Sequence, residues 1–264
     1  MEFDRLIADW RTDGVRHIPQ GWAQGRATFG GLVAAMLHEP MAGRVDSEAS
    51  LRSITFSFIA PAEPGDLEAQ TAVLRAGRSV TQVEGRALQN GQPVLAALAS
   101  FGRSRESSLH LSTAKAPTFP APNQCGCMPE VPGLAPEFTS HFDYRIARGA
   151  MLFSGSQKRE LGGWVRFRHQ EASQAPACVG HLLALIDAWP PALLPMLTKP
   201  APASSLTWTV ELIEPLPAKP ATDWWQYLAE VEQTADGYGV IAARLWDSDG
   251  RLCAFTRQTV TVFG

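Results

Sequence analysis

One acidic side chain stands out because its neighbours in the sequence are apolar. Residues 180–188 read GHLLALIDA, in which Asp187 is the single acidic residue. Burial in such a segment would raise the pKa of this carboxyl group and make its anion a stronger base. A carboxylate of this kind can activate a water molecule as a general base. Such a residue can also cap a helix or form a structural ion pair, so its role depends on the secondary-structure elements that surround it.

Other patterns that could support chemistry are incomplete. Cys125 and Cys127 are one residue apart, which is not the usual spacing of zinc ligands, and no second ligand pair follows. The DSDG stretch at 247–250 is like the start of a calcium loop, but its glycine is misplaced and the final glutamate is missing. The sequence contains no G-x-S-x-G motif, phosphate-binding loop or dinucleotide fingerprint. We therefore expect neither a metal nor a cofactor.

Two short apolar segments are predicted to be buried helices. Residues 31–39 (GLVAAMLHE) and 180–188 are rich in Leu and Ala and contain no cluster of β-branched residues, which favours helix over strand. A helix that is apolar on nearly all sides has to be buried on all sides. A sheet wrapped around each helix would achieve this.

Strand patterns follow each predicted helix in the same order. Apolar and polar residues alternate in 54–58 (ITFSF) and 206–212 (LTWTVEL), as in half-buried strands. Asn90-Gly91 and Asp249-Gly250 are predicted to be the turns of corresponding hairpins. Further strand-length segments occupy 67–77, 79–89 and 92–102 in the first half, and 224–233, 239–247 and 251–263 in the second.

This correspondence indicates that one helix-and-sheet unit occurs twice. The predicted helices are 149 residues apart, the prolines that end the first strands (Pro61 and Pro215) are 154 apart, and the hairpin turns are 159 apart. Between the units the sequence is rich in Ser and Pro and has little periodicity, as expected of an extended crossover. We predict an α+β fold with a first repeat at 1–102, a crossover linker at 103–140 and a second repeat at 141–264.

The overall composition excludes several classes of protein. The 264 residues include 23 Lys+Arg and 26 Asp+Glu, a balance that gives no electrostatic footprint for nucleic acid. No apolar run reaches the roughly 18–20 residues of a membrane-spanning helix, and the charged N-terminus is not a secretory signal. The four cysteines are too few for a disulfide framework. We expect a cytoplasmic protein with reduced cysteines.

Several segments together resemble one family. They are TFGG at 28–31, LRSITFSFIAPAEPGD at 51–66, VLRAGRSVTQVEGRALQNGQPVLAALASF at 73–101, HFDYRIARG at 141–149 and LWDSDGRLCAFTRQTV at 245–260. In these segments the chain resembles the acyl-CoA thioesterase II family. The resemblance implies a double hotdog fold, in which two tandem helix-plus-antiparallel-sheet repeats pack as a pseudo-dimer. It also implies hydrolysis of an acyl-CoA thioester to a free acid and CoA.

The resemblance further implies which residues activate water. The family uses an Asp on the second-repeat helix, a hydroxyl residue at the start of the next strand and a Gln on the last strand. The matching positions here hold Asp187, Ser205 (where the family more often has Thr) and Gln258. The family also usually has a carboxylate and an imidazole where this chain has Thr207 and Trp208.

Strict alternation raises a question about the hydroxyl residue. It places Ser204 on the face of Leu206 and Ser205 on the opposite face. If the buried helix lies on the Leu206 side, Ser204 is the better placed hydroxyl unless the strand contains a bulge. We retain Ser205 as the candidate.

The thioester carbonyl oxygen needs hydrogen-bond donors where negative charge develops. Gly180 lies about 10 Å along the same helix from Asp187, too far to serve the same carbon. If the two helices run antiparallel, the N-terminus of the first lies beside Asp187. Gly30 and Gly31 then become the candidate oxyanion and substrate-binding residues, with close backbone packing as the structural alternative.

The duplication predicts one site per chain. His38 corresponds to Asp187 at the 149-residue offset, and Ala99 corresponds to Gln258 at the offset of the hairpins. The first repeat therefore has neither the carboxylate nor the amide. A site made by both repeats would therefore occur once per chain. His38, if protonated, would interact favourably with the C-terminal end of the helix dipole.

Two alternatives to hydrolysis remain. One is a non-catalytic hotdog protein that binds acyl thioesters or other lipids. The other is a hydratase or dehydratase on the same scaffold, which would need a histidine and a carboxylate in one site; His181 lies on a different helix face from Asp187. The expected partner is the acyl-CoA substrate with its coenzyme A moiety, and two chains could pair as a homodimer through exposed sheet edges.

Overall fold

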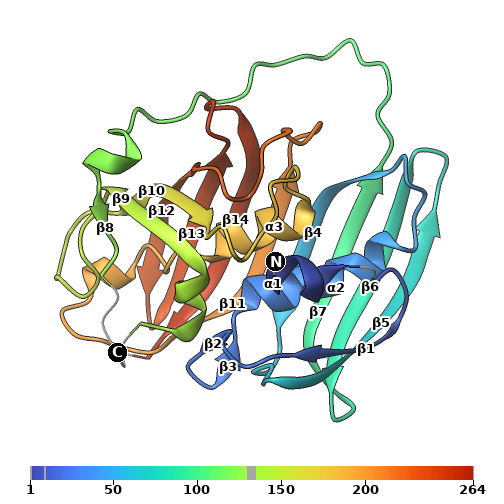
Figure 1. Cartoon of the computed structure of the whole chain (residues 1–264), viewed down its shortest axis with the longest axis horizontal. Coiled ribbons are helices and arrows are strands. Elements are labelled where there is room, and N and C mark those ends of the chain that lie inside the picture. The colour runs from blue at the N-terminus through green and yellow to red at the C-terminus, as the bar shows by residue number, and fades with distance from the viewer. Residues whose placement is uncertain (1, 9, 130–134, 264) are drawn as a thin grey trace.

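The computed structural model describes residues 2–8, 10–129 and 135–263. Twelve strands form one antiparallel sheet in the order β1-β5-β6-β7-β4-β11-β14-β13-β12-β10-β9-β8, which curves around the helices (Figure 1). In the N-terminal half the strands are β1 (Gly14–Ile18), β4 (Ser50–Phe58), β5 (Gly65–Ala76), β6 (Val80–Gln89) and β7 (Gln92–Gly102). In the C-terminal half they are β8 (Gly126–Cys127), β9 (Phe142–Arg148), β10 (Glu160–Phe167), β11 (Ala203–Leu212), β12 (Trp225–Ala235), β13 (Tyr238–Trp246) and β14 (Leu252–Val262).

The helices are few and short. They are α1 (Glu2–Ile7), α2 (Gly30–Ala42) and α3 (Val179–Asp187), with 3-10 turns at Pro122–Gln124, Glu137–His141 and Leu194–Met196. A two-residue ribbon, β2 (Ala23–Gln24) with β3 (Ala27–Thr28), leads into α2. The predicted helices at 31–39 and 180–188 are thus present as α2 and α3, and both are buried. No described helix is long and apolar enough to cross a membrane.

The two buried helices pack against each other in antiparallel orientation. A Cβ atom on Gly31 would lie 3.1 Å from Ala184 Cα, and one on Gly180 would lie 3.4 Å from Ala35 Cβ. The two contacts are equivalent in the two repeats, because Gly180 lies 149 residues after Gly31 and Ala35 lies 149 residues before Ala184. The helix pair therefore has the pseudo-twofold symmetry that the repeat predicts, with small residues at the crossing.

The same symmetry relates the strands at the centre of the sheet. Strands β4 and β11 are neighbours, and Thr55 pairs with Thr209, which lies 154 residues later. Their hydroxyl oxygens are 3.1 Å apart on the outer face. On the inner face the next pair, Phe56 and Trp208, stacks with ring centroids 5.3 Å apart. One continuous sheet therefore joins the two repeats at this seam.

The turns have the backbone that their residues require. Asn90 and Gly91 have φ angles of 51° and 73°, as in the two-residue type I′ hairpin expected between β6 and β7. At the corresponding hairpin Gly250 has a φ of 81°, and its N–H donates to the carbonyl of Asp247. The two halves therefore use different turns at the same place.

The segment between β7 and the first 3-10 turn crosses the outside of the molecule. Residues 103–121 contain no helix or strand and run as a long arc along the upper edge of the molecule in Figure 1. Two indole N–H groups hold this arc: Trp246 Nε1 donates to Ala114 O at 3.1 Å, and Trp164 Nε1 donates to Pro120 O at 2.9 Å.

We predict that Gly31→Ala destabilises the fold. The added methyl group would lie 2.5 Å from the Phe29 ring, which cannot move aside because it stacks on Phe138 at a centroid distance of 4.2 Å. Overpacking of this kind lowers the free energy of unfolding by about 1–3 kcal/mol, measurable by urea denaturation. Gly126→Ala is the control, since a Cβ there meets nothing within 4 Å. Equal stability of the two variants would contradict the close packing around Gly31.

Candidate functional site

Asp187 is the last residue of α3, and both repeats contribute to its surroundings. Gln258 Nε2 donates a hydrogen bond to Asp187 Oδ1 at 3.0 Å, and the Gly31 backbone N–H donates to the same carboxyl group. Burial raises the pKa of Asp187 to about 6, although both hydrogen bonds act to lower it. Asp187 as a whole residue is partly exposed. A carboxylate with a pKa near 6 suits a general base.

The first turn of α2 approaches this carboxylate closely because it begins with glycines. A Cβ on Gly30 would lie 3.0 Å from Asp187 Oδ2 and 3.1 Å from the Phe58 ring. The positive end of the α2 dipole faces the anion, and its free N–H groups are available there. The N–H of Gly31 is taken up by Asp187, whereas the described part of the chain offers no acceptor to the N–H of Gly30.

Gln258 is fixed on the inner face of β14. It pairs with Trp208 on β11 and with Ile241 on β13, and residues paired across antiparallel strands point to the same face. Trp208 is fully buried, and its Nε1 donates to Thr256 Oγ1 at 2.6 Å. The indole at this position is therefore already paired within the core. Thr207 lies on the opposite face and is exposed.

A β-bulge places Ser205 on the side of Gln258. Ser205 pairs with Val260, whereas Thr207 pairs with Thr259, so Leu206 is the extra residue on β11. Val260 is buried and lies two residues beyond Gln258, which puts Ser205 on the same inner face. Strand β11 therefore contains a β-bulge, which the strict alternation of residues does not take into account. Within the described residues, Ser205 Oγ makes no hydrogen bond of its own.

Ser204 lies on the other face of the same strand. It pairs with Thr261, its side chain is exposed, and its hydroxyl group donates to the Ser205 carbonyl at 3.5 Å. Of the two neighbouring serines, Ser205 is the one that faces the interior.

Aromatic side chains surround the carboxylate on the second-repeat side. Burial raises the pKa of Tyr144 and of Tyr227, and the negative charge of Asp187 raises both further, which places the two phenols near it. Tyr144 Oη donates to Ala188 O at 3.1 Å. Trp189 stacks on Tyr227 at 5.3 Å and meets Tyr144 edge-on at 5.9 Å. These rings limit the water around Asp187, which accounts for the desolvation of its charge.

The pseudo-equivalent place in the first repeat lacks these groups. His38 stands where Asp187 would be, and its Nδ1 lies 3.3 Å from Glu39 Oε1. Leu51 occupies the position of Ser205 and precedes an identical bulge, and Ala99 pairs with Ile54 as Gln258 pairs with Trp208. Leu51 and Ala99 are both buried. Among the described residues, the Asp-Ser-Gln set is therefore found once.

A group of possible metal ligands was not predicted from the sequence. One ligand atom each from Glu2, His141 and Glu171 lies within 4.8 Å of the others. However, His141 Nε2 is 2.8 Å from the Gly21 carbonyl oxygen, and its Nδ1 is 3.1 Å from Glu171 Oε2. Both ring nitrogens of His141 therefore already lie against protein oxygens.

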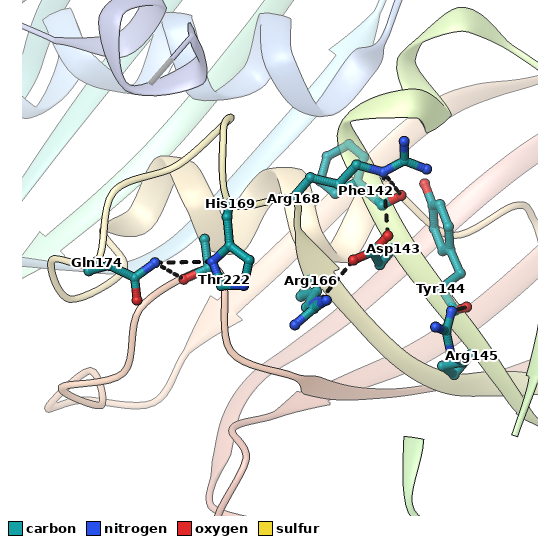
Figure 2. A network of polar contacts seen from close by, with 9 residues as sticks. All are labelled: Phe142, Asp143, Tyr144, Arg145, Arg166, Arg168, His169, Gln174 and Thr222. Carbon is teal, nitrogen blue, oxygen red and sulfur yellow. Dashed lines mark hydrogen bonds and ion pairs between the residues drawn. The ribbon is translucent and has the colours of Figure 1, made fainter. Parts of the chain in front are cut away.

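A polar network on the second repeat is structural in character. Figure 2 shows Asp143 between two guanidinium groups, 2.9 Å from Arg166 Nε and 3.4 Å from Arg168 Nε. Beside it, Gln174 Nε2 donates to Thr222 Oγ1 at 2.9 Å (Figure 2). The carboxylate of Asp143 is thus paired with two arginines. Two surface hollows also lie outside the Asp187 site; one is lined by residues 75, 77–80 and 82, and the other by residues 17, 63–66, 89 and 90.

Comparison with solved structures supports the fold. A hot dog fold protein from Alicyclobacillus acidocaldarius superposes with a TM-score of 0.85 at 24% identity, over 99% of this chain and 98% of the other. A candidate thioesterase II from Thermobifida fusca YX gives 0.83 at 22% identity, over 99% and 97%. The acyl-CoA thioesterase II TesB2 of Mycobacterium marinum gives 0.76 at 17% identity, over 99% and 98%. The fold is a double hotdog.

Family models match both halves of the chain. The model of the acyl-CoA thioesterase N-terminal domain matches residues 18–102, and that of the acyl-CoA thioesterase C-terminal domain matches residues 117–262. No curated protein matches the chain by sequence. Since the C-terminal model alone covers more than half of the residues, the chain belongs to the acyl-CoA thioesterase family.

Proposed function

We propose that this protein hydrolyses acyl-CoA thioesters to a free acid and CoA, with Asp187 as the general base. The observation that carries the proposal is the position of this carboxylate. It is held between Gln258 and the first turn of α2, in surroundings that raise its pKa to about 6. Family membership supports the reaction class.

The mechanism needs no covalent intermediate, because a thioester carbonyl is electrophilic enough for an activated water. Asp187 removes a proton from the water as its oxygen attacks the carbonyl carbon. The amide of Gln258 fixes the carboxylate, and the unpaired hydroxyl group of Ser205 can orient the water. The N–H of Gly30 faces the developing oxyanion. When the C–S bond breaks, the CoA thiolate takes the proton from Asp187.

We expect kcat/KM to rise with pH and to level off above about pH 6. The base is active only when ionised, and the pKa of Asp187 is about 6, so the rate should fall about tenfold per pH unit below that value. Release of free CoA thiol, followed over a series of acyl chain lengths, measures this profile. A value of kcat/KM that does not change between about pH 5 and about pH 8 would contradict the assignment of Asp187 as the general base.

Substitutions separate the proposed roles of the site residues. Asp187→Asn removes the base and should lower kcat by about 10²–10⁴-fold. Ser205→Ala should lower kcat by about tenfold, whereas Ser204→Ala, on the opposite face of the same strand, should change it less than about twofold. Equal effects at the two serines would refute the role of Ser205. Binding of acyl-CoA without thiol release at any chain length would instead make the protein a non-catalytic binder.

Removal of the charge at Asp187 should also stabilise the fold. The pKa of Asp187 is raised from 3.8 to about 6 in the folded protein, so ionisation opposes folding once the pH exceeds 3.8. At pH near 8 this cost is about 1–3 kcal/mol, and Asp187→Asn should recover most of it. Thermal unfolding at about pH 8 and at about pH 4 measures the difference. A variant that is less stable than the parent at the higher pH would contradict the desolvated charge.

A further inference from the structure

A second polar cluster lies at the opposite end of α3 from Asp187. Cys178 is the residue that caps this helix, and its Sγ lies 3.2 Å from His181 Nδ1. His181 Nε2 in turn lies 2.9 Å from Oδ1 of Asp4 in α1. The other oxygen of Asp4 accepts the backbone N–H of Ser173 at 2.8 Å. A thiol, an imidazole and a fixed carboxylate are thus arranged in series.

The geometry suits transfer of the thiol proton to the imidazole. In the neutral ring, Nε2–H donates to Asp4, and Nδ1 is left as the acceptor facing the backbone N–H and the Sγ of Cys178. Burial acts to lower the pKa of His181, but its hydrogen bonds to Asp4 and Cys178 outweigh burial and raise it to about 9. The imidazole is therefore placed to accept the thiol proton at Nδ1.

The other three cysteines have different surroundings. Burial and the charge of Asp247 raise the pKa of Cys253 to about 12, and burial raises the pKa of Cys125. Cys127 is exposed. Within the described residues, none of these three sulfurs has a hydrogen bond to an imidazole. Cys178 as a whole residue is partly exposed.

We propose that Cys178 is a nucleophilic thiol, with His181 as its base and Asp4 as the positioning residue, and that hydroperoxides modify it. The thiolate attacks one peroxide oxygen, an S–O bond forms and the O–O bond breaks. Sulfur is oxidised by two electrons to a sulfenic acid, and the peroxide is reduced. The leaving oxygen takes the proton that His181 received from the thiol, which gives water when the reagent is hydrogen peroxide.

This site is separate from the proposed hydrolytic site. Cys178 and Asp187 are nine residues apart, or about 13 Å along the helix. Cys178→Ser should therefore leave thiol release from acyl-CoA unchanged. Failure of the hydrolysis proposal would not affect the reactivity of Cys178.

Competition between the cysteines of the folded protein tests the proposal. Limiting iodoacetamide at neutral pH, followed by peptide mass spectrometry, should label Cys178 at least about tenfold faster than Cys127, although Cys127 is more exposed. Hydrogen peroxide followed by dimedone should tag Cys178 first. Slower labelling of Cys178 than of Cys127 would show that Cys178 is only a helix cap.

Variants test the base and the positioning residue. His181→Gln and Asp4→Asn should each slow labelling of Cys178 by about tenfold and leave the rate at Cys127 unchanged. The ultraviolet absorbance of the thiolate, taken as the difference between the parent chain and Cys178→Ser, gives a spectroscopic readout. This readout needs neither of the other variants to fold. No absorbance difference at neutral pH would overturn the proposal.

Discussion

The approach of one carboxylate to the first turn of a helix from the other repeat constrains the whole structure. Asp187 accepts the Gly31 N–H and lies where a Cβ atom on Gly30 would be 3.0 Å from its Oδ2. The approach also requires α2 and α3 to run antiparallel and to cross at small residues. Desolvation of the charge opposes folding, and the dipole of α2 and the amide of Gln258 offset part of that cost. The local arrangement and the packing of the repeats are therefore interdependent.

Two repeats with one backbone plan have acquired different side chains. The bulge after Leu51 matches the bulge after Ser205, so the distortion that re-aims the strand belongs to the repeat itself. Polar groups occupy the inner face at that bulge in the second repeat, and apolar groups fill it in the first. The first repeat instead contributes the glycine turn. Each half therefore supplies what the other lacks.

Much of the fold could be predicted from local patterns. Alternation located β4 and β11, Leu and Ala content located α2 and α3, and Asn90-Gly91 located a type I′ turn. Strand β10 was not predicted because nearly all of its residues are buried, which removes the alternation. Strand β1 at an edge of the sheet, helix α1 near the start of the sequence and strand β9 were also missed, since each is short.

The site was less predictable for a physical reason. The raised pKa of Asp187 follows from its apolar neighbours, but the inward position of Ser205 depends on a bulge that hydrophobic patterning does not show. The pairing of Asp4 with His181 joins residues 177 positions apart. No local signal in the sequence predicts such a contact. The Cys178–His181 spacing of three residues was visible, yet it has chemical meaning only with Asp4 beside it.

The seam between β4 and β11 has a consequence for how the molecule comes apart. Backbone hydrogen bonds run without interruption from one repeat to the other through Thr55 and Thr209, and the buried helices share a common interface. Separation of the halves would expose unpaired strand edges and an apolar helix face to water at the same time. Unfolding of either repeat should therefore unfold the other, so that the protein unfolds on heating in a single cooperative step although it consists of two repeats.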